Sequence, residues 1–506
     1  MKRLTAWYLL FFILITYLLI NTGLVSDDLI YVHVLKDRNF TMLLLPGEGW
    51  QTCPVENYTH RIWYHFFSVD NTALADILKI IYIILAFYMT TRFFSIFLNK
   101  PDAFLASFIF IFFPSHDTTV YWFLAQYLTL SMAFYLYAFY LAHHNRLFPA
   151  FLVATLASFI SYGSPAIALS LFVIFALNKE FKKGAALLIP NIIYSMYYIY
   201  LTKVMSAGVA RIPEQISVFT IGKQFVFQAV TFIDAVIGPS MWLKVYYSFH
   251  QLSFMSIMVG IILTACLYSL LKENRRRYDP KLIIGFTVMM ISSFVMFAVT
   301  GKYPQLAFNV GDRVTIFGSL LITYLIILAP VSNRIKMLAY FVLIFSILGI
   351  SDHWKMTHDR LQVIYSNIKN NKDLVNYGDR RAIYVSGNQY SKFGKISHIE
   401  LMSDESVGCL FSMLLGKEVT AMPFNKNYRY EDGDIADTKS GERYRVDGYI
   451  NVYDSTKNIL FKLYARDINS YIDSLPRDSR HWSQAFDIGF IKQLAAKMMP
   501  RLKYAL

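Results

Sequence analysis

Charged residues are scarce in this chain of 506 residues. Asp, Glu, Lys and Arg together make up 16% of it, whereas 56% of the residues are hydrophobic and the mean hydropathy is +0.40. This composition excludes a soluble globular protein of the same size, because such a protein carries more charge. Several apolar stretches reach the roughly 20 residues that a bilayer crossing requires. The sequence therefore predicts a polytopic α-helical membrane protein.

Cysteines, repeats and metal-ligand motifs are also few or absent. Of the three cysteines, Cys53 and Cys409 could bond, but no feature of the sequence brings them together. The sequence has no internal repeat, which counts against a transporter built from two matching halves. It also shows no complete set of metal ligands. We therefore predict no metal and no other cofactor, and leave a divalent cation open.

Hydropathy predicts about eleven membrane spans. The first is too long for a cleavable signal and lacks a small-residue cleavage site, so we expect it to stay as an anchor. Residues 225–237 are predicted as a helix at the membrane interface, since a crossing there would put the basic residues 275–277 on the wrong side. Pairs of short predicted spans, such as the two within residues 102–142, could be re-entrant. The predicted spans are residues 5–24, 77–97, 102–114, 120–142, 147–161, 165–177, 184–202, 252–271, 282–300, 315–331 and 337–350.

Lysine and arginine are distributed unevenly among the loops. With a cytoplasmic N-terminus, the predicted inner loops hold most of the basic residues between spans, and the short outer loops near 115–119 and 161–165 hold none. This bias explains most of the net charge of +14 and indicates contact with anionic lipid, not with nucleic acid. We therefore predict that residues 1–350 form a membrane domain.

Residues 351–506 are more polar and contain no spanning run. We predict that they form a soluble α+β domain on the outer, periplasmic side, of a typical domain size. Strands are predicted at 381–386, 449–453 and 459–464, with a hairpin turn at 454–458. Residues 396–415 have apolar positions at helical spacing, which predicts a helix.

An acidic pair, Asp27 and Asp28, follows directly on the first predicted span. Two carboxylates are costly in hydrocarbon, so the pair must lie at the water interface, where it can reach a lipid substrate whose head group lies at the same depth. That position suits a general base. The alternative is that the two acids are solvated charges beside a helix end.

Other polar residues on the predicted outer face could handle protons or phosphate. Arginine binds phosphate through its planar fork and lysine as a point charge. Several of these residues also have a structural alternative. Asp312 and Arg313 could form a local ion pair, and the lysine at 302 could only extend its ammonium to the membrane interface. The histidine at 116 could cap a helix. The candidates are His116 and Asp117 in the turn between the third and fourth spans, Lys302, Tyr303 and Arg313 before the tenth span, and Arg211 after the seventh.

With Asp27-Asp28 after the first span, a long first outer loop and an outer C-terminal domain, the chain resembles the GT-C glycosyltransferases. These include aminoarabinose transferases of lipid A, protein O-mannosyltransferases and O-antigen glucosyltransferases. The resemblance implies that either acid deprotonates or orients an acceptor hydroxyl in an inverting transfer, and that the donor is a polyprenyl-phosphate sugar. It also implies that His116 and Asp117 form a second acidic element. Lys302 and Arg313, with Tyr303 and Arg211, would face the departing lipid phosphate.

The sequence then predicts a bacterial inner-membrane glycosyltransferase that acts on a surface glycan or a lipid-linked acceptor at the periplasmic face. No Trp-Trp-Asp motif occurs, which counts against transfer of a preassembled oligosaccharide to asparagine. Two alternatives stay open. One is an O-antigen polymerase or ligase, which depends more on outer-loop arginines; the other is a transporter or flippase without covalent chemistry.

Overall fold

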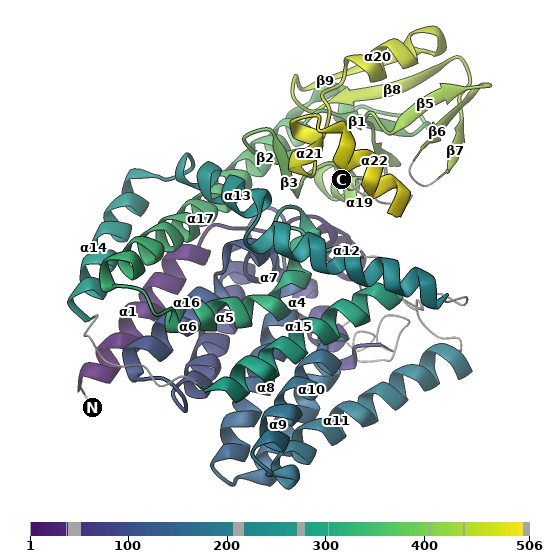
Figure 1. Ribbon diagram of the computed structural model, residues 1–506. Helices are drawn as coiled ribbons and strands as arrows, with labels where there is room; N and C mark the ends of the chain where they lie inside the picture. Colours follow the sequence, from purple (N-terminus) through teal and green to yellow (C-terminus); the bar gives the residue numbers. More distant parts are fainter. Residues whose placement is uncertain are drawn as a thin grey trace.

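Two parts of different architecture make up the computed structural model, which describes residues 2–36, 38, 52–205, 217–270, 279–301, 303–403, 406–438 and 441–498. The first part is helical, and the strands gather at one end of the molecule within the second part (Figure 1). The long helix α17 (Asn333–Asn370) runs from the helical part to the strands (Figure 1).

Apolar sequence stretches form the main helices of the first part. They are α1 (Lys2–Leu19), α5 (Ala73–Phe94), α6 (Lys100–Ile111), α8 (Gln126–His143), α9 (Leu147–Ile160), α10 (Ser164–Leu177), α11 (Phe181–Ile199), α12 (Val218–Val236), α13 (Pro239–Phe249), α14 (Phe254–Leu270), α15 (Pro280–Thr300) and α16 (Ile316–Leu328). Shorter helical segments connect them. These are α2 (Asp27–Lys36), α4 (Pro54–Phe66), η2 (Pro114–His116), α7 (Thr118–Tyr121), η3 (Phe123–Ala125), η4 (Tyr200–Val204) and η5 (Val310–Thr315).

Each of the eleven predicted spans contains a helix. Seven candidate segments in the described part of the chain are long and apolar enough to cross a membrane: 73–94, 123–143, 181–204, 218–249, 280–300, 310–328 and 333–370. Helices α1, α9, α10 and α14 supply apolar stretches of only 10–17 residues. The chain therefore has the helices of a multi-pass membrane protein, and eleven crossings stays a prediction.

The apolar segment 218–249 is two helices, because the chain bends at Gly238 and Pro239 between α12 and α13. Near the bend, Asp234 accepts hydrogen bonds from the Trp482 indole at 3.0 Å and the Ser240 hydroxyl at 2.5 Å. Its Oδ2 also lies 2.9 Å from His481 Nε2. The end of α12 thus contacts the C-terminal part. Residues 218–249 are also long and apolar enough to cross a membrane, so the interfacial placement of residues 225–237 stays a prediction.

Two loops that were both predicted to be cytoplasmic meet in the structure. The Lys281 ammonium at the start of α15 donates to the side-chain amide oxygen of Asn178 after α10. Such a contact requires the two loops to lie on one side of the helices, as the distribution of basic residues predicts.

The predicted domain boundary at residue 350 falls inside α17, which continues without a break to Asn370. The long apolar stretch of this helix ends near residue 350, but its helical hydrogen bonds continue beyond that point. The division into residues 1–350 and 351–506 therefore stays a prediction, with one helix shared by both parts.

The strands form three small sheets. The largest has the order β4-β1-β8-β9, in which β1 (Ile383–Ser386) runs parallel to β4 (Ala421–Pro423) and β8 (Tyr449–Asp454). Strand β9 (Ile459–Tyr464) pairs antiparallel with β8, which confirms the predicted hairpin. The other sheets are β2 (Tyr390–Phe393) with β3 (Ile396–Glu400), and β5 (Tyr428–Glu431), β6 (Asp434–Asp437) and β7 (Arg443–Arg445). The remaining elements are α18 (Lys372–Val375), α19 (Ser406–Leu415), η6 (Ala465–Asp467), α20 (Ile468–Ser474), α21 (Trp482–Ala485) and α22 (Gly489–Met498).

The helix predicted at 396–415 is wrong in its first part. Residues 396–400 form strand β3, and the helix α19 begins only at Ser406. The turn before β3 contains Gly394 in the left-handed region, at φ 57°, which closes a β2–β3 hairpin. Strand β3 is buried along most of its length, so its apolar residues do not alternate and periodicity alone could not identify it.

Both parts share one apolar core. Ile383 and Val385 of β1, with Phe393 and Ile396 of the hairpin, belong to the same buried cluster as the membrane helices. A second, smaller cluster includes Tyr384 of β1 and lies among β5, β6, β8 and α20. The β2–β3 hairpin is thereby fixed against α13, α17 and η5, where it completes a polar cluster.

Candidate functional site

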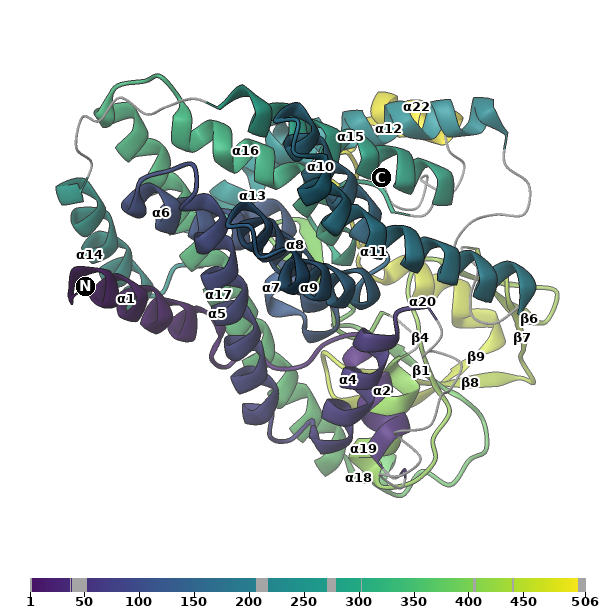
Figure 2. The same cartoon turned by 90° about the horizontal axis from the view of Figure 1, so that it is seen from below.

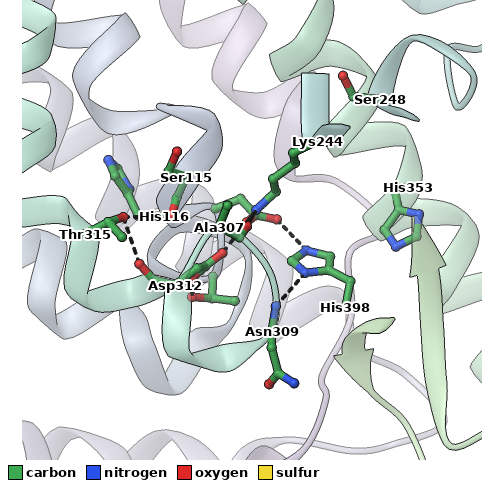
Figure 3. A network of polar contacts seen from close by, with 12 residues as sticks. Ser115, His116, Lys244, Ser248, Ala307, Asn309, Asp312, Thr315, His353 and His398 are labelled. Carbon is green, nitrogen blue, oxygen red and sulfur yellow. Dashed lines mark hydrogen bonds and ion pairs between the residues drawn. The ribbon is translucent and has the colours of Figure 1, made fainter. Parts of the chain in front are cut away.

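A buried polar cluster forms around Asp117, at the junction of η2 and α7. Its Oδ1 lies 2.5 Å from the Lys244 ammonium of α13. Its Oδ2 accepts hydrogen bonds from the Trp354 indole of α17 at 2.7 Å and from His398 Nε2 of β3 at 2.9 Å. All four side chains are buried. Figure 3 shows Lys244 and His398, which come from different elements, in this cluster.

A second carboxylate, Asp312 of η5, shares the same lysine. The Lys244 ammonium lies 3.2 Å from Asp312 Oδ2 and also donates to the backbone carbonyl of Ala307. The other oxygen of Asp312 accepts from the Thr118 hydroxyl. Thr315 adds a bond from its hydroxyl to the Ser115 carbonyl at 2.7 Å. The cluster therefore holds η5 firmly against η2.

The protonation of His398 follows from its two partners. Its Nδ1 accepts a hydrogen bond from the Asn309 backbone N–H at 3.0 Å, so Nε2 carries the proton and donates it to Asp117. Burial lowers the pKa of His398 below its ordinary value, although Asp117 opposes this. Burial alone would raise the pKa of Asp117, but Lys244 and His398 hold it well below its usual range. The pair is thus a carboxylate accepting from a neutral imidazole.

Asp117, Asp312 and His398 also resemble a metal-ligand set. One ligand atom from each lies within 4.8 Å of the others. Carboxylate and imidazole groups are common metal ligands. In this arrangement, however, the Lys244 ammonium contacts both carboxylates and supplies the positive charge between them. A cation could enter only if Lys244 moved away.

The predicted acidic pair forms the start of α2, directly after the loop that connects α1 to α2. Asp28 is fully buried; its Oδ2 accepts from the Val25 backbone N–H at 3.1 Å. Its Oδ1 accepts from the Tyr64 hydroxyl and from the Leu124 backbone N–H at 3.3 Å. Burial raises the pKa of Asp28 from 3.8 to about 7, and these hydrogen bonds only partly oppose it. Asp27 is only half-buried.

The loop that carries the acidic pair is fixed from α5. Lys79 donates to the Gly23 carbonyl and the Thr22 hydroxyl, each at 2.6 Å, and pairs with Asp76 at 2.7 Å. Asp76 in turn accepts from the Gly23 N–H at 3.0 Å. Figure 2 shows α2 beside α4 and α19, so the C-terminal part covers this loop. Asp27 is therefore held at a defined place just beyond the C-terminal end of α1.

The other predicted site residues fall in different surroundings. His116 is buried; its Nδ1 donates to the Thr119 hydroxyl at 3.0 Å, and burial lowers its pKa to about 4. Arg313 does not pair with its neighbour Asp312, whose partner is Lys244. Its guanidinium lies 5.2 Å from the Trp122 ring centroid and 5.3 Å from that of Tyr303, at cation–π distance.

Two further candidates, Lys302 and Arg211, lie outside the described residues. Tyr303 connects Arg313 to an apolar pocket of about 280 Å³. Helices α10, α11 and α15 form the walls of this pocket, which are lined by Pro165, Ile199, Met296, Phe297 and Val299 together with several tyrosines. An apolar chain fits such a lining, with its polar end toward Arg313.

Sequence reasoning missed Lys244, Trp354 and His398, and its alternative of a local Asp312–Arg313 ion pair is wrong, since Asp312 contacts Lys244. A lysine within an apolar stretch is costly and marks a polar partner nearby, so Lys244 gave a usable signal. No pattern around His398 indicates its role, because its partner Asp117 is 281 residues away in the sequence. The structure brings Asp117 and Asp312 together, and it places Asp28 in a separate hydrogen-bonded cluster.

Comparisons with known proteins identify no family. No family model matches the chain, and no curated protein matches it. Among solved structures, the chain is similar to the Archaeoglobus fulgidus oligosaccharyltransferase in complex with Zn and sulfate, with 11% sequence identity and a TM-score of 0.36. The match covers 81% of this chain and 62% of the archaeal chain, so the present chain spans less than two thirds of that enzyme. No residue role is transferred from that protein.

Proposed function

We propose that this protein is a membrane glycosyltransferase of the GT-C type. It moves one sugar from a polyprenyl-phosphate donor to a hydroxyl of a surface glycan or lipid-linked acceptor, at the periplasmic face of a bacterial inner membrane. The observation that carries the proposal is the rigid loop after α1, which presents a half-buried carboxylate, Asp27, beside a fully buried one, Asp28. A fixed carboxylate at the membrane surface suits general-base catalysis on a lipid-linked substrate.

We propose different roles for the two acids. Both oxygens of Asp28 accept hydrogen bonds inside the protein, so this side chain shapes the turn and cannot reach an acceptor. Asp27 occupies the first turn of α2, where the helix dipole favours the ionised form. We therefore assign Asp27 as the base and Asp28 as a positioning residue.

In the proposed reaction, the acceptor oxygen attacks the anomeric carbon as Asp27 takes its proton. The bond between that carbon and the phosphate oxygen breaks, and polyprenyl phosphate leaves with the bonding electrons. Arg313 is suited to the growing charge on this phosphate, because its guanidinium is held between two rings beside an apolar pocket that fits the lipid chain. Lys302 and Arg211 stay candidates for the same phosphate.

The cluster around Asp117 fits a positioning role in this scheme. Asp312 precedes Arg313 directly, and the bonds of Lys244 fix η5, which carries both residues. The predicted second acidic element therefore acts through its neighbours. Through Lys244, Asp117 fixes the backbone segment that positions Arg313. His116 packs between the rings of Phe110 and Phe113.

The proposal is tested by the mass of surface glycans from cells that express the wild-type chain, Asp27→Asn, Asp28→Asn or Asp70→Asn. Asp70 is a matched control, because it is an exposed carboxylate whose one ion pair within the described residues is with the surface residue Lys369. We expect a sugar-sized mass increment with wild type and Asp70→Asn. Loss of a general base lowers the rate by about 10²–10⁴-fold, so Asp27→Asn should abolish the increment.

Insertion and folding are checked separately by membrane fractionation and thermal unfolding. An increment of normal size with a folded Asp27→Asn variant would remove the catalytic assignment. If wild type adds no mass although polyprenyl-phosphate sugars are present, the transferase proposal itself fails.

A further inference from the structure

A polar pocket of about 380 Å³ is lined by residues of the C-terminal part and by Arg360 near the end of α17. It opens where the parallel strands β1, β4 and β8 reach their carboxyl ends. Asp454 at the end of β8 lines it, together with residues that follow these strands: Gly387, Asn388, Phe424, Asn425, Thr456 and Lys457. Ligands of open sheets with parallel strands bind at this edge, and the volume lies within the range of about 300–1,000 Å³ found for small-molecule sites.

The backbone of the pocket is built for close approach. Gly387 has φ 74°, and a Cβ at this position would lie 2.4 Å from the Thr456 hydroxyl oxygen. Asn388 also has a positive φ, of 42°. The facing turn is capped by Asp454, whose Oδ1 accepts from the N–H groups of Thr456 at 2.9 Å and Lys457 at 3.2 Å. The turn after β1 and the turn after β8 therefore pack closely against each other at the edge of the pocket.

Hydrogen-bonding groups of both kinds line this space. The donors include Arg360, Lys392 and Lys457, and the acceptors include Asp454 and Asp478. Gln389 is buried, and its amide nitrogen donates to the carbonyls of Val385 and Gly387. Its Oε1 accepts no hydrogen bond from any described residue. A buried acceptor of this kind normally has a partner, and a ligand hydroxyl would provide one.

Aromatic rings complete the lining. Phe424 and Tyr471 are stacked, with ring centroids 6.1 Å apart and planes at 10°. The Tyr471 hydroxyl is fixed 2.7 Å from the Ser386 hydroxyl, so its ring cannot turn away. Phe424 is fully buried behind Tyr471, so the partly exposed Tyr471 ring is the apolar surface that a ligand can reach. Such a ring, combined with mixed donors and acceptors, suits a molecule with C–H faces and many hydroxyl groups.

The charges of the pocket favour an acidic ligand. Lys392 pairs with Asp478 at 2.6 Å, and Lys457 lies 3.5 Å from Asp454. Arg360 donates to the Asn388 side-chain oxygen, and among the described residues it makes no ion pair with an acid. The lining therefore has one cationic charge in excess, on a guanidinium that can accept a carboxylate or phosphate in a bidentate manner.

We propose that this pocket binds a saccharide, with an acidic substituent of that saccharide placed against Arg360. The pocket also connects to the acidic loop. Tyr390, in its wall, accepts a hydrogen bond from Arg480; Arg480 lies 3.9 Å from Glu400, and Glu400 accepts from the Ser26 hydroxyl at 3.4 Å. Ser26 is the residue before Asp27. Only the identification of this saccharide as the acceptor rests on the proposed transferase function; its binding does not.

Binding is tested with the full-length protein in detergent on an array of acidic and neutral oligosaccharides. Inorganic phosphate is titrated separately by calorimetry. The variants are Arg360→Glu and Lys457→Glu, both surface charges whose reversal leaves the cores intact. Arg466→Glu is the matched control, since its side chain is 85% exposed and lies outside the pocket. Thermal unfolding confirms that each variant is folded.

We expect wild type and Arg466→Glu to bind uronate- or phosphate-bearing saccharides, with at least tenfold weaker binding by Arg360→Glu and by Lys457→Glu. Absence of saccharide binding by wild type, binding that both pocket variants retain, or binding of inorganic phosphate alone would each overturn the proposal. Because no donor is added, these outcomes are independent of transferase activity. Saccharide binding without any glycan increment in cells would overturn the transferase proposal and leave the binding site standing.

Discussion

Replacing Lys244 with methionine should destabilise the protein more than any surface lysine substitution. The Lys244 side chain is fully buried and contacts two carboxylates, Asp117 at 2.5 Å and Asp312 at 3.2 Å. Methionine has a similar length but no charge, so the ionised Asp117 would lose its cation without access to water. Burial and the neighbouring Asp117 raise the pKa of Asp312 well above its usual range, so Asp312 adds no second unpaired charge. Removing one partner of a buried ion pair costs about 3–5 kcal/mol, and we expect a loss of unfolding free energy in this range.

The matched control is Lys183→Met. Lys183 pairs with Glu180 one helical turn away at 2.7 Å, with side chains that are 17% and 37% exposed. Such a pair contributes about 0.3–0.5 kcal/mol. Reversible unfolding in mixed micelles, followed by tryptophan fluorescence, gives the free energy for both variants. Trp354, which donates to Asp117, should also report the loss of the cluster by a shift of its emission.

A neutral version of the cluster separates charge from shape. In the triple variant Lys244→Met, Asp117→Asn, Asp312→Asn, no buried charge is left unpaired, so it should recover most of the stability that Lys244→Met loses. If Lys244→Met were no more destabilising than Lys183→Met, Lys244 would not be the cation of a closed buried cluster. If the triple variant were as unstable as the single one, the loss would come from packing instead of charge.

Three further outcomes can be measured on the same protein. In the folded protein the pKa of Asp28 is raised from 3.8 to about 7. Its contribution to the free energy of unfolding is therefore most favourable below pH 3.8, and about 4 kcal/mol is lost as the pH rises through 7. The free energy of unfolding should depend less on pH in Asp28→Asn than in the wild type. Gly23→Ala should lower the free energy of unfolding by at least about 1–2 kcal/mol, since φ is +64° and a Cβ would lie 1.9 Å from His358 Nδ1. The control Gly222→Ala places its Cβ in open space and should not lower the free energy of unfolding. Arg313→Ala should lower kcat/KM for a polyprenyl-phosphate sugar about tenfold or more and leave the acceptor KM unchanged. In the proposed reaction, Arg313 faces the charge that grows on the departing phosphate, and a charge-assisted hydrogen bond is worth about 1.5–3 kcal/mol; an equal effect on both substrates would remove its donor role.

Hydropathy predicted where the membrane helices lie, because burial in lipid requires long apolar segments and leaves a strong signal in the sequence. It could not predict where α17 ends, since the helix continues to Asn370 through polar residues. It also did not identify β3. A strand that is buried on both faces and a buried helix have the same apolar composition, and the hairpin is fixed instead by Gly394 and by packing against the membrane helices.

The acidic residues were easier to find than their partners. Asp27, Asp28 and Asp117 stand out beside apolar segments. The partners of Asp117, in contrast, lie 127 residues away at Lys244 and 281 residues away at His398. Only the packing of α13 and of the β2–β3 hairpin on η2 brings these groups together, and local sequence patterns carry no record of that packing.

The two acidic clusters differ in the property that matters most for catalysis, which is access to a substrate. Asp117 accepts from three donors that are themselves buried, so it can take a proton from a substrate only if the cluster opens. Asp28 is closed in the same way, by Tyr64 and two backbone N–H groups. Asp27 alone among the three is half-buried. If the chemistry takes place at the acidic loop, substitutions in the closed clusters should change stability and the alignment of Arg313, whereas Asp27→Asn should stop turnover in a protein that still folds.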